Sequence, residues 1–233
     1  MKPTPPAPEP ENPASAVGLP PLAWRALPFV PGEPPFGVFV LADPDALLDG
    51  LDDASFSASD ERMPYYALLW PSGLALADAV GQAGDCAGLC VLDLGCGVGA
   101  EGLAAARQGA EVTFLDWAPE AEVLVGLSAR RLGLSSQRFV LADWRTPPAD
   151  LGRFDRILAA DVLYEARNAE PVARFLAAHL SGAGEAWLTD PGRLHARDFP
   201  GIAVAAGLAL VEERRLASPE PEATITLLRV RLE

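Results

Sequence analysis

The segment from Val91 to Gly99, which reads Val-Leu-Asp-Leu-Gly-Cys-Gly-Val-Gly, constrains the fold of this chain more than any other segment. Its first four residues have the composition of a buried strand, and three alternating glycines follow them. Glycine at positions 95, 97 and 99 lets the backbone turn sharply and approach a ligand closely, and the helix that follows would present unpaired N–H groups. The segment therefore predicts a strand, a tight turn and a helix that together bind an anionic group.

Around this turn, short apolar runs alternate with helical patterns, which is typical of a parallel sheet with helices on both faces. Two later segments, 208–216 and 223–232, flank a turn-rich Ser-Pro-Glu-Pro at 218–221 and predict an antiparallel pair. We therefore expect an α/β fold: a Rossmann-like, doubly wound sheet of seven strands, mostly parallel, with an antiparallel C-terminal hairpin. The other expected strands are 89–94, 111–115, 139–141, 154–160 and 185–189, and the expected helices lie between Gly99 and Gly109, between Pro119 and Gly133, and at 171–180 and 193–206.

The N-terminal part of the chain has a different composition. Residues 1–21 contain eight prolines and little that could pack in a core, so we expect a disordered, proline-rich arm. Residues 22–80 are expected to form a small N-terminal elaboration that leads into the core, with a strand at 36–41 and a short helix from Asp43 to about position 50. The main domain is then expected to span 81–233.

The charge of the chain limits its partners. Lysine and arginine total 18 against 32 aspartates and glutamates, which gives a formal net charge of −14. Such a surface repels phosphate backbones, so we expect no nucleic-acid partner. The same charge favours a basic partner, such as a lysine-bearing protein surface.

The cysteines indicate the cellular compartment. Cys86, Cys90 and Cys96 lie within eleven residues of one another, and their odd number and close spacing do not form a disulfide framework. His179 and His195 lie far along the chain without ligand spacing around them, so we expect no metal site. The cysteines are interpreted as small buried hydrophobic residues of a protein in a reducing compartment.

Membrane and export signals are weak in this sequence. The N-terminus lacks an apolar core followed by a cleavage site, and the longest apolar run, 201–211, is too short to span a bilayer. We therefore expect no membrane association and a cytoplasmic location.

The glycine turn suits two nucleotide cofactors. S-adenosylmethionine (SAM) carries a carboxylate that fits the helix N-terminus and an ammonium group that Asp93 could bind directly or through water. However, residues 97–102 also fit the dinucleotide pattern Gly-x-Gly-x-x-Gly, with Asp116 nineteen residues after its first glycine. A carboxylate at the end of the second strand can accept both hydroxyls of a ribose, so Asp116 does not distinguish SAM from NAD.

An aromatic pair after the third strand favours SAM. Asp143 can bond the amino group of an adenine and Trp144 can stack on its ring. Trp117, next to Asp116, could cover the other side of the adenine or belong to the core.

The end of the fourth strand is where chemistry is expected, because ligands of open α/β sheets bind at the carboxyl ends of the strands. There the segment Asp161-Val-Leu-Tyr164 resembles the Asp-x-x-Tyr motif of the seven-strand protein lysine methyltransferases, the family that includes the electron transfer flavoprotein beta-subunit lysine methyltransferase. The upstream segment from Pro64 to Ala77, which contains Trp70-Pro71, is similar to that family's tryptophan-proline segment. The resemblance runs from about Leu27 to Leu232.

This resemblance implies a SAM-dependent N-methyltransferase of the class I fold, with 81–233 as the methyltransferase domain and S-adenosylhomocysteine (SAH) as the product. The acceptor implied is a lysine side chain of a protein. Asp161 and Tyr164 would then lie beside the transferred methyl group as catalytic residues. The residues expected to contact the cofactor are Trp70, Asp93, Gly95, Cys96, Gly97, Gly99, Asp116, Trp117, Asp143 and Trp144.

The chemistry of methyl transfer shapes the expected role of Asp161. The protein must chiefly align an amine with a sulfonium methyl group, provide an apolar approach and receive the amine deprotonated. A carboxylate attracts a lysine ammonium but also raises its pKa, so proton loss to water before attack is the simpler hypothesis. Val162 and Leu163 stand where methyltransferases acting on nucleobase amino groups usually carry prolines, which argues against nucleic-acid methylation.

Three alternatives remain open. The first is methylation of a small molecule, the second an NAD(P)-dependent oxidoreductase that uses the dinucleotide pattern, and the third a non-catalytic SAM-fold protein that binds a partner. Dehydrogenases normally continue into a sizeable substrate domain, whereas only about forty residues follow the fifth expected strand. This length counts against the oxidoreductase.

Overall fold

The structure is a computed structural model of the 233-residue chain. It describes residues 19–27, 36–43, 65–84, 86–135, 137–217 and 224–233. The short helix expected after Asp43, the turn expected at 218–221 and all but the last three residues of the expected proline-rich arm lie outside these ranges.

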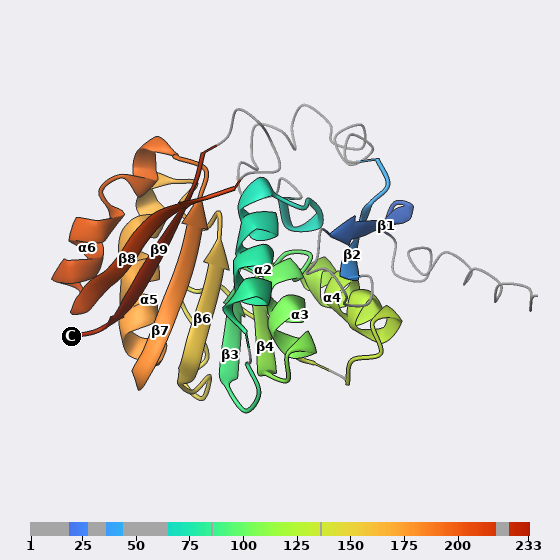
Figure 1. The fold of residues 1–233 in the computed structure, drawn as a ribbon, viewed down its shortest axis with the longest axis horizontal. Helices are drawn as coiled ribbons and strands as arrows, with labels where there is room; N and C mark the ends of the chain where they lie inside the picture. The colour runs from blue at the N-terminus through green and yellow to red at the C-terminus, as the bar shows by residue number, and fades with distance from the viewer. Residues whose placement is uncertain (1–18, 28–35, 44–64, 85, 136, 218–223) are drawn as a thin grey trace, which may run out of the picture.

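A seven-stranded sheet forms the centre of the fold (Figure 1), as predicted. Its strands lie in the order β5-β4-β3-β6-β7-β9-β8. The first five strands in this order are parallel, whereas β9 is antiparallel to both β7 and β8. The hairpin therefore folds back so that β9 lies between the two strands that precede it in sequence. The bounds are β3 Cys90–Leu94, β4 Glu111–Asp116, β5 Arg138–Leu141, β6 Phe154–Ala160, β7 Leu180–Asp190, β8 Leu208–Leu216 and β9 Ile225–Leu232.

Helices cover both faces of this sheet (Figure 1). Side chains alternate between the faces along a strand, so Val91 packs in a first core under α2, α3 and α4, whereas Leu92 and Leu94 pack in a second core under α5 and α6. The central strands β3, β4 and β6 are apolar on both faces, which explains their nearly continuous hydrophobic runs. The helices are α2 Pro71–Ala83, α3 Ala100–Arg107, α4 Pro119–Arg131, α5 Ala169–His179 and α6 Phe199–Ala205.

The helix predicted at 193–206 is wrong in its extent. The structure has a short 3-10 turn, η6 Leu194–Ala196, and then the separate helix α6. Pro200 accounts for the break, because it lacks an N–H and its ring would clash with the carbonyl four residues earlier, so it suits only the first turn of a helix.

A separate two-stranded sheet is attached to α4. Strands β1 (Leu22–Leu27) and β2 (Phe36–Leu41) pair antiparallel and lie beside α4 in Figure 1. The backbone N–H of Phe39 donates to Ser128 Oγ of α4 at 2.9 Å, and the Phe39 ring packs edge-on against Trp24 at 5.2 Å. Strand β2 was predicted, but β1 was not. The arm predicted at 1–21 also extends too far, because Leu19 is buried in the first core.

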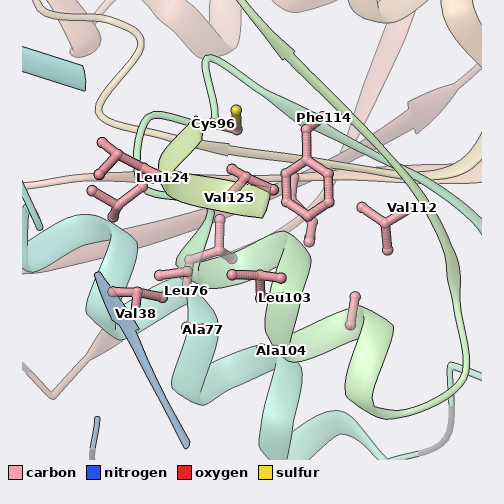
Figure 2. Close-up of a cluster of buried hydrophobic side chains, with 14 of the residues drawn as sticks. Val38, Leu76, Ala77, Cys96, Leu103, Ala104, Val112, Phe114, Leu124 and Val125 are labelled. Atoms are coloured by element: carbon pink, nitrogen blue, oxygen red, sulfur yellow. The ribbon is translucent and has the colours of Figure 1, made fainter. Parts of the chain in front are cut away.

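The first core holds the start of α3 against the sheet, as Figure 2 shows. Phe114 of β4 and Val125 of α4 pack beneath the glycine turn. A Cβ at Gly99 would lie 2.7 Å from Val125 Cγ2, and a Cβ at Gly102 would lie 2.5 Å from the Phe114 ring. These two glycines therefore allow α3 to pack closely enough for its first turn to border the cavity described next.

Candidate active site

A cavity of about 890 Å³ opens at the carboxyl ends of the central parallel strands. This is the edge of an open α/β sheet where ligands bind, and the volume suits a nucleotide-sized molecule. Ten of the twelve residues predicted from the sequence line the cavity, and the other two, Asp93 and Gly99, do not. The ten are Trp70, Gly95, Cys96, Gly97, Asp116, Trp117, Asp143, Trp144, Asp161 and Tyr164.

The glycine turn is built around a left-handed backbone. Gly95, Gly97 and Gly99 have φ angles of 67°, 48° and 74°, a region that disfavours residues with a Cβ. A Cβ at Gly97 would lie 2.9 Å from the backbone oxygen of Tyr66, so the turn and the segment before α2 approach closely only because this residue is glycine.

Asp116 braces this turn from the end of β4. Its Oδ2 accepts a hydrogen bond from the Gly97 N–H and its Oδ1 accepts one from the Ala118 N–H, both at 2.9 Å. Burial raises the pKa of Asp116, and these backbone hydrogen bonds act in the opposite direction. Each oxygen keeps a further lone pair, so contact with a ligand hydroxyl remains compatible with this role.

Asp93 lies beneath the cavity wall rather than in it. Its side chain is fully buried, and its Oδ2 accepts a hydrogen bond from the Gly102 N–H at 2.9 Å. Burial and the neighbouring Glu101 raise its pKa well above the usual range. Asp93 does not line the cavity, and its Oδ1 is buried without a hydrogen-bond partner in the described part of the chain.

Glu101 is a cavity residue that the sequence did not single out. It stands in the first turn of α3, lines the cavity and is only 4% exposed. Burial raises its pKa to about 8. An acid in the first turn of a helix is usually a solvent-exposed partner of the helix dipole, so its position in the sequence gave no sign of burial.

The residues predicted to bind an adenine occupy one side of the cavity. Trp144 is buried in the second core, and its ring would lie 3.0 Å from a Cβ at Gly95. Asp143 is half-buried and accepts hydrogen bonds from Arg145; burial alone would raise its pKa, but these bonds lower it overall. Trp117 is 44% exposed at the rim, so it is not a core residue.

Asp161 lies just past the end of β6 in a strained conformation. Its φ is 58°, and no other non-glycine residue in the described ranges has a positive φ. Its backbone N–H donates to Thr189 O at 2.9 Å, and its Oδ1 accepts from Arg193 Nε at 2.6 Å. The other carboxylate oxygen, Oδ2, is buried and has no hydrogen-bond partner within the described part of the chain.

Aromatic rings gather beside Asp161. Tyr65 belongs to a 3-10 turn, η4 Tyr65–Ala67, and its ring lies 5.8 Å from the Trp70 ring and 6.3 Å from the Tyr164 ring. Trp70 Nε1 donates to Tyr65 O at 3.1 Å, which fixes the tryptophan. Burial raises the pKa of Tyr164, so its hydroxyl stays protonated near neutral pH and can donate a hydrogen bond.

Arg193 is the second cavity residue that the sequence did not single out. Its guanidinium lies 5.9 Å from the Trp70 ring, on the side where it pairs with Asp161. Its backbone N–H and that of Gly192 both donate to Asp190 Oδ1 at 2.7 Å. The available signal was the tight turn Asp190-Pro-Gly-Arg193 directly after a parallel strand, at the same sheet edge as the glycine turn.

The charges of the cavity are unevenly paired. Each of its three arginines contacts a carboxylate: Arg145 pairs with Asp143, Arg167 with Glu165 and Arg193 with Asp161. By contrast, no arginine or lysine of the described ranges pairs with Glu101.

Cys86 and Cys96 are buried and Cys90 is exposed, and the Cys86 sulfur accepts a hydrogen bond from Arg156 at 3.5 Å. Among the residues that the structure describes, no group of histidines, cysteines and acids is placed to hold a metal ion. The described helices include none long and apolar enough to cross a bilayer.

A seven-stranded sheet in this order, with one antiparallel strand and a glycine turn beside a cavity at its edge, defines the class I methyltransferase fold. In agreement with this, residues 91–184 match the family described as a methyltransferase domain. The match covers the glycine turn and the segment from Asp161 to Tyr164.

The chain is also similar to curated proteins named as lysine methyltransferases. The electron transfer flavoprotein beta subunit lysine methyltransferase of Mus musculus is 31% identical to this chain over 161 residues, which are 68% of this chain and 60% of that protein. The Danio rerio protein of the same name is 32% identical over 138 residues, 58% of this chain and 53% of that protein. The aligned part of this chain thus spans between half and two thirds of each relative.

Solved structures agree on the fold. TrmN from Thermus thermophilus is 27% identical, with a TM-score of 0.58 over 74% of this chain and 52% of that one. Magnesium protoporphyrin IX methyltransferase from Synechocystis, solved with bound SAM, is 21% identical, with a TM-score of 0.59 over 81% of this chain and 90% of that one.

Proposed function

We propose that this protein is a SAM-dependent N-methyltransferase that methylates a lysine side chain of a protein. The observation that carries this proposal is that Asp161 and Tyr164 line one cavity together with the rings of Tyr65 and Trp70, in a chain 31–32% identical to protein lysine methyltransferases. A carboxylate among aromatic faces suits an ammonium group or the amine formed from it.

The cavity fits SAM, which would supply an activated methyl group on its sulfonium when bound. The close approach at Gly97 forms a cradle that any side chain would fill, and Trp144 Nε1 is a buried donor without a partner among the described residues. We assign Gly95, Cys96 and Gly97 to the amino-acid part of the cofactor, Asp116 to the ribose, and Trp117, Asp143 and Trp144 to the adenine. Trp70 would border the methyl group.

The acceptor side of the site follows from Asp161. Its unpaired Oδ2 can accept a hydrogen bond from an approaching amine, while Tyr65, Trp70 and Tyr164 keep water away from the nitrogen. Because Arg193 already offsets the charge of Asp161, we expect this carboxylate to orient the amine rather than to remove its proton. The proton would leave to water before methyl transfer.

A labelling experiment tests the proposal. The enzyme would be incubated with tritiated SAM and either purified electron transfer flavoprotein or a lysate from its source, and labelled residues would be identified by mass spectrometry. The chain contains a single lysine, Lys2, so self-labelling can be recognised easily. We expect methyl-lysine on a protein substrate with the wild type and a strongly reduced rate with Asp161→Asn. Label in small molecules alone would instead support the alternative acceptor.

The expected surroundings of the enzyme belong to this proposal. The formal charge of −14 supports a basic protein surface as the acceptor and disfavours nucleic acid. The odd number and close spacing of the cysteines, which do not form a disulfide framework, support a reducing, cytoplasmic location.

A further inference from the structure

We infer that Glu101 binds the ammonium group of the cofactor's amino-acid part and thereby takes the role that the sequence suggested for Asp93. This inference rests on the proposed function, because it assumes that SAM or SAH occupies the cavity. The contact to the ammonium group then comes from Glu101 in α3, which lies outside the glycine turn.

The position of Glu101 is the first support. The residue follows Gly99 by two positions, so its side chain leaves the first turn of α3 where the glycine turn ends. A Cβ at Gly73 of α2 would lie 3.4 Å from Glu101 Oε2 and 3.9 Å from Ala160 Cβ. Glu101 therefore lies between α2 and the end of β6, at a point that lines the cavity but is almost closed to solvent.

The charges around Glu101 are the second support. Glu101 raises the pKa of the neighbouring Asp93 of β3, and Asp161 raises the pKa of Glu101, so the ionisation of one acid opposes that of the next. Arg193 pairs with Asp161, and the residue of α2 nearest to the Glu101 carboxylate, Gly73, is uncharged. Asp161 Oδ2, in a side chain more than nine-tenths buried, has no hydrogen-bond partner among the described residues, and Asp161 borders the same cavity. A cation at this point would stabilise the ionised form of Glu101, which burial and Asp161 otherwise disfavour.

The chemistry of the ligand determines which group belongs there. A carboxylate would be repelled by Glu101, so the carboxylate of the amino-acid part must bind elsewhere. The methyl acceptor approaches the aromatic rings beside Tyr164, which are more exposed than Glu101. The cofactor has two cationic groups, the sulfonium of SAM and the ammonium. The sulfonium has no N–H to donate, whereas the ammonium does, and an ionised carboxylate binds an ammonium strongly in a buried site.

The titration of Glu101 makes the inference measurable. Its raised pKa means that the free protein carries a proton on Glu101 near pH 7, whereas the ammonium-bound state requires the carboxylate form. Binding of SAH near pH 7 should then release about one proton to the buffer, and affinity should rise with pH until Glu101 is ionised in the free protein.

Isothermal titration calorimetry with two ligands tests this contact. SAH carries the amino-acid part, and 5′-methylthioadenosine lacks it. For Glu101→Gln we expect SAH binding to weaken about tenfold or more, while 5′-methylthioadenosine binding stays within about twofold. Glu122→Gln, at an exposed acid of α4, is the matched control and should change neither affinity. Titrations of the wild type in buffers of different ionisation enthalpy measure the released proton.

The outcomes separate this inference from the proposed function. Two results would overturn the Glu101 assignment and leave the methyltransferase proposal standing. In the first, Glu101→Gln binds SAH as tightly as the wild type does. In the second, Glu101→Gln loses affinity for SAH and for 5′-methylthioadenosine equally. A wild type that binds neither SAM nor SAH would overturn both. If the variant failed to fold, the wild-type titrations alone would decide, since SAH binding without proton release and without dependence on pH contradicts the assignment.

Discussion

Arg193 and Asp161 form an ion pair inside the cavity, with Arg193 Nε 2.6 Å from Asp161 Oδ1. The pair joins the turn after β7 to the end of β6. Asp190 Oδ1 accepts a hydrogen bond from the Arg193 backbone N–H and so holds that turn in place. One carboxylate oxygen is thereby held and the other is left for a ligand. Arg193 is thus a positioning residue for the proposed acceptor site.

Removing this ion pair should impair turnover more than cofactor binding. For Arg193→Met we expect kcat to fall about 10- to 100-fold, because Asp161 loses its fixed orientation, while SAH affinity changes little. Arg193→Lys should recover part of the loss, since an ammonium can replace one contact of the guanidinium. Arg197→Met, at an exposed neighbouring position, serves as the control. Equal kinetics of Arg193→Met and the control would contradict this role.

The left-handed backbone of Asp161 predicts an unusual order of stability. Glycine tolerates a φ of 58° and alanine does not, so Asp161→Ala should be less stable than Asp161→Gly by about 1–2 kcal/mol. Urea unfolding of the two variants measures the difference. Both should lose methyl transfer, which separates the backbone effect from the chemical one. An alanine variant at least as stable as the glycine variant would show that this residue carries no strain.

The close approach at Gly97 predicts that even a methyl group disrupts the cofactor site. Gly97→Ala would bring a Cβ to 2.9 Å from Tyr66 O at a positive φ, so we expect loss of SAH binding and about 1–2 kcal/mol of destabilisation.

Gly126→Ala is the matched control for this substitution, because Gly126 lies inside α4 and an added Cβ meets only the end of the Arg130 side chain, 3.7 Å away. It should stabilise the protein by about 0.5–1 kcal/mol and leave binding unchanged. Thermal melting with and without SAH measures both effects, and SAH binding by Gly97→Ala would refute the predicted cradle.

The raised pKa of Glu101 predicts how stability depends on pH. The folded protein holds a proton on Glu101 up to about pH 8, whereas the unfolded chain releases it near the ordinary pKa of a glutamate, 4.5. The folded state therefore binds more protons in this window, and its stability falls as pH rises from about 4.5 to about 8. Without ligand, Glu101→Gln should show a shallower decline and a higher Tm than the wild type at pH 8. An identical pH profile would contradict the raised pKa.

Local signals were sufficient for much of the fold. The bounds of α4 follow from Pro119 at its start and Gly133 after its end. A proline suits the first turn of a helix, and a glycine adopts the left-handed conformation that ends one. Strand β1 escaped prediction because its pairing with β2 and its packing against Arg131 are tertiary contacts, which a six-residue segment does not encode.

Residues of the candidate site that directly follow the expected strands were predictable from the sequence. Residues that reach the site only through contacts between distant segments were harder to predict. The position of Asp93 could have been inferred from strand alternation, since it shares a face with Val91 under α3, whereas Leu92 and Leu94 face the second core. Glu101 and Arg193 become cavity residues only because α2 and β6 lie next to them in space. No pattern within their own segments indicates this proximity.

The reversed strand β9 has a consequence for folding during synthesis. Strand β8 leaves the ribosome before β9, yet β9 is the strand through which it joins the sheet. Until residues 225–232 emerge, β7 presents an open edge and β8 has no partner in the sheet, so both can pair with other chains. Nascent chains stalled before residue 225 should therefore be prone to aggregation, even though the glycine turn and its flanking elements, β3 and α3, are already complete.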